Sequence, residues 1–195
     1  MTADNHGSRI RIADAALSEF SANGFDGARI ARIAERARVN KQLIYYYYGS
    51  KAKLYESVVG RVSDALTDQI RIRAGTDSPV DRIRARMAAV FHHLASHADQ
   101  ARLVVTAVSE SGERSAPIRA AVRSFITQVH QEISAAQGTG YLRDDVDPEQ
   151  AADQIVTLLL GYFSLAPVLG RAGRRPSSDA WIRSTGDLVA RSLGW

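Results

Sequence analysis

The apolar residues of this chain recur at helical spacing nearly throughout, and no segment shows the strict alternation of apolar and polar residues that a half-buried strand requires. In the first segment Ile12, Ala16, Leu17 and Phe20 follow this spacing, and Gly24 supplies a stop. We therefore predict an all-α protein of about nine helices, over residues 8–23, 28–37, 40–46, 50–73, 79–96, 100–110, 115–136, 148–165 and 177–193.

Composition narrows the class of protein further. The 195 residues leave room for one domain, or for a small domain and a larger one. The absence of cysteine excludes disulfides, thiolate catalysis and Cys-ligated zinc. Residues 1–20 carry no signal-peptide pattern, and the most apolar run, 155–170, is shorter than the roughly 18 residues that a membrane span needs. We expect a cytoplasmic protein without membrane contact.

Positive charge is concentrated in one segment. The net charge is +4, from 25 basic and 21 acidic residues, but residues 28–53 alone hold seven basic residues against one acid, Glu35, for a net charge of +6. The rest of the chain therefore carries −2. A cationic patch on a nearly neutral body is typical of nucleic-acid binding, although a solvated basic face explains the charge equally well.

The same segment predicts two short helices that cross at a tight turn. Ala34 and Ala37 are small enough to permit close crossing, Val39 adds an apolar contact, and Asn40 is a strong N-cap for the second helix. This is the pattern of a helix-turn-helix, in which the second helix enters the major groove with its N-terminus first.

The predicted second helix carries side chains suited to reading bases. Lys41 can donate to guanine, Gln42 can pair with adenine, and Tyr45 lies on the same face as Gln42. Lys51 begins the next helix, where free N–H groups attract phosphate. The predicted DNA contacts are Arg29, Lys41, Gln42, Tyr45, Tyr46, Tyr47 and Lys51. Tyr48 and Leu54 are predicted to pack inward, and core packing is the alternative for the other tyrosines as well.

Residues 9–61 resemble the DNA-binding domain of the TetR (tetracycline-repressor-like) family, and 141–149 resemble its later part more loosely. The matching residues are Ala15-Ala-Leu17, Phe20, Gly24-Phe25, Ile33-Ala34, Ala37, Val39, Leu43 or Ile44, Tyr45, Tyr48, Ser50-Lys51 and Leu54. The resemblance implies a three-helix helix-turn-helix domain over 1–54. It also implies a larger helical domain over 55–195 that dimerises and often binds a small effector.

Several positions depart from the pattern of that family. Ala28 stands where a Thr usually caps the second helix, so this helix can start instead at residues 26–27. Arg38 replaces the usual turn glycine, which predicts a left-handed residue or a different turn. Gln42 replaces a common small residue and Tyr48 a common Phe. Arg38 and Gln42 leave the preferred DNA sequence open.

The segment 148–165 is apolar nearly all round, which predicts a helix that is central or shared between subunits. With the apolar stripe of 177–193 it predicts a four-helix bundle formed by two protomers; a central helix of a monomer is the alternative. The predicted interface residues are Leu158, Tyr162, Leu165, Trp181 and Leu188. Two recognition helices about one DNA turn apart then imply a roughly palindromic operator.

An effector pocket is expected in the C-terminal part, although its candidate lining residues serve equally well as core. They are Phe91, Leu94, Val104, Val108, Phe125 and Val129. The role of the cluster His92, His93 and His97 is open. His93 and His97 have the spacing of a possible metal pair, but we interpret them as surface or pocket residues, and we predict no metal and no cofactor.

Two short segments match parts of enzyme motifs, but the sequence around them lacks the features that those motifs require. Ser50-Lys-Ala-Lys53 fits a Ser-x-x-Lys pattern without its companion motifs, and Gly138-Thr-Gly140 has neither a third glycine nor a preceding strand. A helical enzyme has no need of the +6 segment, and a non-specific DNA-coating protein would spread its basic residues along the chain. We predict a non-enzymatic homodimeric repressor that a small molecule releases from double-stranded operator DNA; activation is the alternative.

Overall fold

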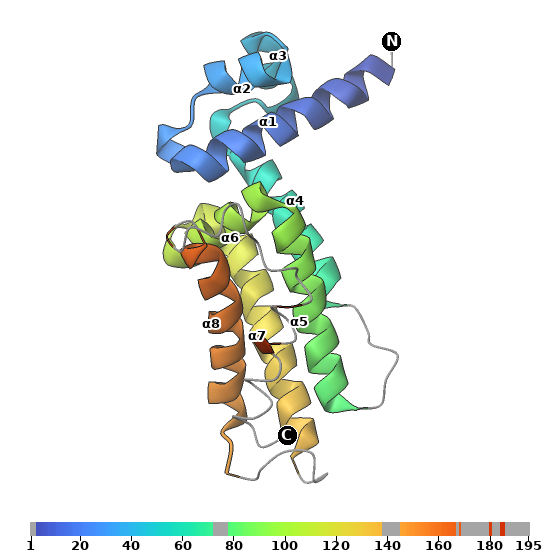
Figure 1. Ribbon diagram of the computed structural model, residues 1–195. Helices are drawn as coiled ribbons and strands as arrows, with labels where there is room; N and C mark the ends of the chain where they lie inside the picture. Colours follow the sequence, from blue (N-terminus) through green and yellow to red (C-terminus); the bar gives the residue numbers. More distant parts are fainter. Residues whose placement is uncertain are drawn as a thin grey trace. The chain divides into compact units, whose positions relative to one another are not determined.

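The computed structural model describes residues 3–71, 78–137 and 145–166, together with residues 168, 180, 184 and 185 (Figure 1). These residues form two compact units. The first comprises the described residues of Met1–Asp64 and Ala98–Arg119, and the second those of Ala65–His97 and Ala120–Trp195. Throughout the described ranges the regular structure is helical, which confirms the predicted all-α fold.

Eight α-helices and one short 3₁₀ helix are found within the described residues. They are α1 (Ala3–Gly27), α2 (Ile30–Ala37), α3 (Lys41–Tyr48), α4 (Lys51–Ile70), α5 (Pro79–Ser96), α6 (Ala98–Ser109), η1 (Glu113–Ser115), α7 (Ala116–Ala136) and α8 (Pro148–Leu165). The predicted ninth helix, with Trp181 and Leu188, lies largely outside the described residues. None of the described helices combines the length and apolarity needed to cross a membrane.

The helices α1, α2 and α3 pack around one apolar core in the first unit (Figure 1). Ile12, Phe20, Ile33 and Ile44 are almost completely buried, because the apolar positions of each helix fall on the face turned toward the other two. Gly24 interrupts α1 with a left-handed φ of 66°, as its predicted role as a stop requires.

The turn between α2 and α3 contains a strained arginine. Arg38 has φ 55° and ψ 48°, the left-handed conformation that the sequence allowed as one alternative. Its N–H donates to the Glu35 carbonyl at 3.1 Å, and the Val39 N–H donates to the Ala34 carbonyl at 2.9 Å. This pair of bonds is the Schellman motif, whose left-handed position normally holds glycine.

Replacing Arg38 by glycine should therefore stabilise the protein relative to replacing it by alanine. Both changes remove the same charge, but only glycine relieves the left-handed strain, which costs about 1–2 kcal/mol for an L-residue. We expect Arg38→Gly to have a free energy of unfolding about 1 kcal/mol above that of Arg38→Ala, measured by urea denaturation at one protein concentration. Equal stability of the two variants would show that the turn is not strained.

The start of α2 differs from the prediction. The helix begins at Ile30 rather than at residues 26–28, because neither Ala28 nor Arg29 offers a side-chain cap. The cap comes from another helix: the buried Glu19 carboxylate of α1 accepts from the Arg29 N–H at 3.1 Å and pairs with Arg32 at 3.5 Å. A residue ten positions earlier therefore satisfies the first free N–H of α2.

The second unit is built on α5, α7 and α8 with the end of α4. Phe91 of α5 packs against Tyr162 and Phe163 of α8, with ring centroids 5.0 and 5.3 Å apart. Ser78 caps α5 and Asp147 caps α8, each before a proline in the first turn. These caps fix where each helix begins.

A buried ion pair joins α5 to α7. Arg86 donates to Glu132 Oε1 at 2.6 Å and to Gln128 Oε1 at 2.5 Å, and it also donates to the Ile70 carbonyl at the end of α4. The two charged side chains are only 9% and 13% exposed. Arg86 therefore connects three helices of the second unit through one guanidinium group.

Candidate nucleic-acid interface

The helix α3 presents a polar and aromatic surface to solvent. The Asn40 side chain accepts from the Leu43 N–H at 2.8 Å, which confirms the predicted cap and fixes the first turn. Ile44 anchors the helix in the core, with no exposed surface. The opposite face exposes four of the predicted DNA-contacting side chains: Lys41, Gln42, Tyr45 (48% exposed) and Tyr46 (75% exposed).

The other two tyrosines of α3 are half-buried. Tyr47 packs edge-on against Tyr46, with ring centroids 5.3 Å apart. Tyr48 was predicted to pack inward, and it does so only in part, because its hydroxyl reaches the Arg9 carbonyl of α1 at 3.2 Å. Leu54 is fully buried, as predicted. The tyrosine run thus divides into exposed and half-buried pairs.

Lys51 stands in the first turn of α4, which Ser50 caps by accepting from the Lys53 N–H at 3.2 Å. Its ammonium lies 4.9 Å from the centroid of the Phe25 ring and donates to the Asp26 carbonyl at 3.3 Å. The charge is therefore held against the protein, beside the free N–H groups of the helix, where an anion is favoured. Arg29, the remaining predicted contact, is exposed at the start of α2.

A polar network behind Lys51 is not evident from the sequence. Tyr55 packs on Phe20 and Phe25, and its hydroxyl lies 3.1 Å from Ser115 Oγ, which in turn donates to Glu110 at 3.2 Å. Burial raises the pKa of the Tyr55 phenol above its ordinary value, although the bond to Ser115 opposes this shift. Sixty residues separate the partners, so no local pattern could have paired them.

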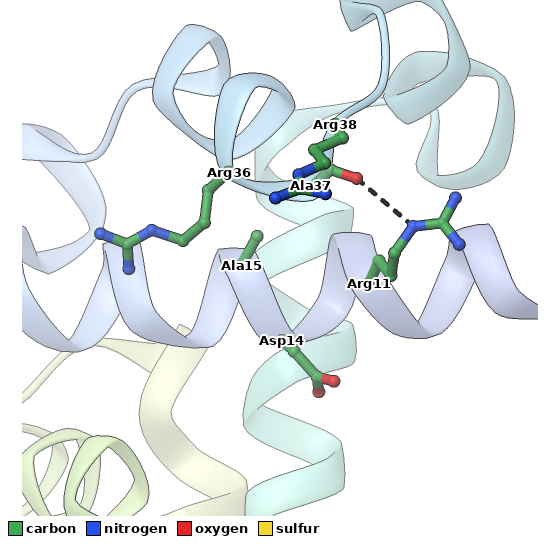
Figure 2. A pocket seen from close by; sticks show the side chains of 6 residues that line it. All are labelled: Arg11, Asp14, Ala15, Arg36, Ala37 and Arg38. Atoms are coloured by element: carbon green, nitrogen blue, oxygen red, sulfur yellow. Dashed lines mark hydrogen bonds between the residues drawn. The ribbon is translucent and has the colours of Figure 1, made fainter.

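A cationic hollow of about 460 Å³ lies between α1 and the end of α2 (Figure 2). Its lining consists of Arg11, Asp14, Ala15, Arg36, Ala37 and Arg38. Figure 2 shows the guanidinium groups of Arg11 and Arg36 pointing to opposite sides, so they do not converge on one anion. Asp14 is paired with Arg61 at 2.9 Å. The hollow therefore adds positive surface rather than a chelating site.

The residues proposed for an effector pocket fall in both units. Phe91, Leu94, Phe125 and Val129 are buried in the second unit, whereas Val104 is buried and Val108 half-buried in the first. Of the proposed interface, Leu158 and Leu165 are 41% and 53% exposed on α8, and Tyr162 is half-buried against Phe91.

The histidines at the end of α5 form a stacked pair rather than a metal cluster. The rings of His93 and His97 lie 4.5 Å apart, and His97 Nδ1 is 2.7 Å from the His93 carbonyl. Within the described residues, no group of three or more potential ligands could hold a metal ion.

Comparison with known proteins identifies the family. The family model for bacterial regulatory proteins of the tetR family matches residues 12–58, and the model for the tetracyclin repressor-like C-terminal domain matches residues 79–175. The chain is 28% identical to the HTH-type transcriptional repressor NicS of Pseudomonas putida, over 95% of this chain and 92% of that protein. It is 29% identical to the HTH-type transcriptional repressor SCO4008 of Streptomyces coelicolor, over 88% and 84%.

A solved structure shares the fold across both units. The crystal structure of AibR in complex with isovaleryl coenzyme A and operator DNA has a TM-score of 0.76 and 19% identity, covering 93% of this chain and 97% of that one. The two family models together span the exposed helix α3 and most of the helices that follow it. The chain therefore belongs to the tetR family of bacterial regulatory proteins.

Proposed function

We propose that this regulator is a homodimeric repressor whose α3 helices read a palindromic operator and whose second unit binds a small-molecule effector. The main support for this proposal is the exposed face of α3, from which Lys41, Gln42, Tyr45 and Tyr46 project. The helix itself is fixed, because Asn40 caps it and its other side is buried in the core. Tyr45 and Tyr46 keep about half or more of their surface exposed, so burial in the core does not account for these aromatic side chains, whereas contact with DNA does.

The proposed division of labour follows from exposure and position. Lys41, Gln42 and Tyr45 read bases, because they occupy the exposed first turns of α3. Tyr46, Tyr47, Lys51 and Arg29 hold the phosphate backbone, which fixes register but carries no sequence information directly. Such a regulator acts in the cytoplasm by occupying promoter DNA, and it catalyses no reaction.

Selection from a random pool of duplex DNA tests this function. The full-length protein should enrich an inverted repeat whose half-sites are about one helical turn apart, at physiological salt. Enrichment of an unrepeated sequence would contradict the dimeric arrangement. Retention of DNA without any sequence enrichment, in protein freed of bound ligand by refolding, would favour a non-specific DNA-binding role instead.

Dimerisation through α8 is supported by its exposed apolar side chains. Leu158 and Leu165 lie seven residues apart and therefore share a face, while Ile155 and Leu159 of the same helix are buried. Two large side chains exposed on one face are typical of an interface between subunits.

Leu158→Ala should weaken the dimer. Truncation removes apolar surface that each protomer buries on association, worth about 1 kcal/mol per protomer, so the dimer dissociation constant should rise about tenfold or more. Sedimentation equilibrium measures this constant, with Ser134→Ala at an exposed position of α7 as the control. An unchanged dissociation constant in Leu158→Ala would place the interface elsewhere.

Effector binding is proposed for the apolar interior of the second unit, around Phe91, Leu94, Phe125 and Val129. The similarity in fold to a regulator crystallised with both a coenzyme A ester and operator DNA supports this part of the proposal. The effector would act by binding more tightly to a conformation that does not fit the operator.

A further inference from the structure

We propose that Arg114 is an additional phosphate-binding residue. Arg114 and Lys51 both lie against the Phe25 ring, and we call this pair of cations the clamp. This inference rests on the proposed function, since it concerns the same DNA. Arg114 belongs to η1, more than fifty residues beyond the segment matched by the DNA-binding family model, which ends at residue 58.

The two cations share one aromatic ring. The Arg114 guanidinium carbon lies 4.3 Å from the Phe25 ring centroid, and the Lys51 ammonium lies 4.9 Å from the same point. These two distances limit the separation of the charges to about 9 Å. A DNA strand carries one phosphate per 3.4 Å of helix axis, so cations this close can face neighbouring phosphates of one strand.

The backbone around Arg114 is firmly held. Arg119 donates to the Glu110 carbonyl at 2.9 Å and to the Gly112 carbonyl at 2.7 Å, which fixes the segment that leads into η1. On the other side of Arg114, Ser115 is buried and bonded to Tyr55. A long side chain mounted on a fixed backbone and stacked on a ring loses little additional entropy when it binds an anion.

The charges near Arg114 leave its guanidinium available. Arg114 is exposed, and no ion pair is found for it within the described part of the chain. The nearest acids in sequence are Glu110, which accepts from Ser115, and the exposed Glu113. Together with the free N–H groups at the start of α4, Lys51 and Arg114 offer two positioned cations and a helix terminus to the same stretch of DNA backbone.

The test is the salt dependence of DNA binding. Each phosphate contact contributes about 0.9 to the slope of log affinity against log salt concentration, and Arg114→Gln removes one contact from each protomer of the proposed dimer, so it should lower that slope by about 2. At 100 mM salt the affinity of the dimer should fall about 30- to 100-fold for operator and random duplexes alike, since a phosphate contact carries no sequence information. Fluorescence anisotropy between about 50 and 200 mM KCl measures both quantities.

Two further variants separate charge from packing. Arg114→Lys keeps the cation and should retain the wild-type slope, and Arg123→Gln, which removes another exposed arginine, on α7, should leave the slope unchanged. An Arg114→Gln slope equal to that of the wild type overturns the proposal. An equal loss in Arg114→Lys and Arg114→Gln at every salt concentration overturns it too, because Arg114 would then act only by stacking on Phe25.

The binding measurements separate an error in the role of Arg114 from an error in the proposed function. If the wild-type protein shows no preference for any operator, the proposed function fails, yet the slope on random duplexes still decides the role of Arg114. If operator preference is present and the Arg114→Gln slope is unaltered, only the clamp is wrong. If Arg114→Gln fails to fold, as judged by circular dichroism, Arg114→Met replaces it, because methionine removes the charge and can still pack on the Phe25 ring; a wild-type slope in Arg114→Met overturns the proposal in the same way.

Discussion

Glu132→Ala should lower the free energy of unfolding by about 3–5 kcal/mol, because it leaves the charge of Arg86 buried without its counter-ion. The Arg86 guanidinium is held by Glu132, Gln128 and the Ile70 carbonyl, and its side chain is only 9% exposed. The remaining neutral partners cannot compensate for a desolvated positive charge. Urea denaturation followed by circular dichroism, at fixed protein concentration, measures the change.

An exposed ion pair on α5, the helix that carries Arg86, serves as the matched control. Arg84 and Asp81 lie 3.6 Å apart with about half of each side chain exposed, so Arg84→Ala should change the stability by less than about 0.5 kcal/mol. The double variant Arg86→Met/Glu132→Leu should recover most of the loss, since apolar replacement of a whole buried pair is often neutral. A loss below about 1 kcal/mol in Glu132→Ala would contradict the buried ion pair.

The double variant Lys41→Ala/Gln42→Ala should bind the selected operator about 100- to 1,000-fold more weakly than the wild type. Each well-placed contact to a base edge is worth about 1–3 kcal/mol of discrimination, and both side chains project from the exposed first turn of α3. Binding to random duplexes should fall much less, so the preference for operator is what is lost. Competition anisotropy with operator and random DNA measures the ratio.

Lys53→Ala is the control for this loss. It removes an exposed lysine of α4 that has no assigned contact to bases, so it should change affinity for operator and random DNA by the same small factor. Tyr45→Phe removes a single hydroxyl and should have an intermediate effect. Operator preference within about threefold of the wild type in the double variant would show that α3 does not read the bases.

Local patterns predicted the parts of the fold that local interactions determine. Asn40 caps α3 and Gly24 interrupts α1, as predicted, and Arg38 takes the left-handed conformation that was one of two alternatives, because each depends on neighbouring backbone alone. The start of α2 was predicted wrongly because it depends on a side chain from another helix. Its cap, Glu19, comes from another helix, and a buried carboxylate on an apolar face is visible in the sequence only as an acid beside Phe20.

In the candidate site, too, features set by local spacing were predicted and features set by tertiary packing were not. Exposure of Lys41, Gln42 and Tyr45 follows from helical spacing in one segment, and all three were predicted. Arg114 was not, since its place beside Phe25 depends on how η1 packs against the helix-turn-helix bundle of the first unit. Spacing along the chain carries no information about that packing. The assignment of bases and phosphates to individual residues remains a prediction.

Methylation interference on the selected operator shows whether paired α3 helices enter the major groove of a palindromic site. Methylation at guanine N7 lies in the major groove, and methylation at adenine N3 lies in the minor groove. We predict interference at N7 in two clusters, related by the symmetry of the operator and separated by about 10 base pairs. Interference confined to adenine N3, or to a single unpaired cluster, would show that two α3 helices do not bind the major groove in this way.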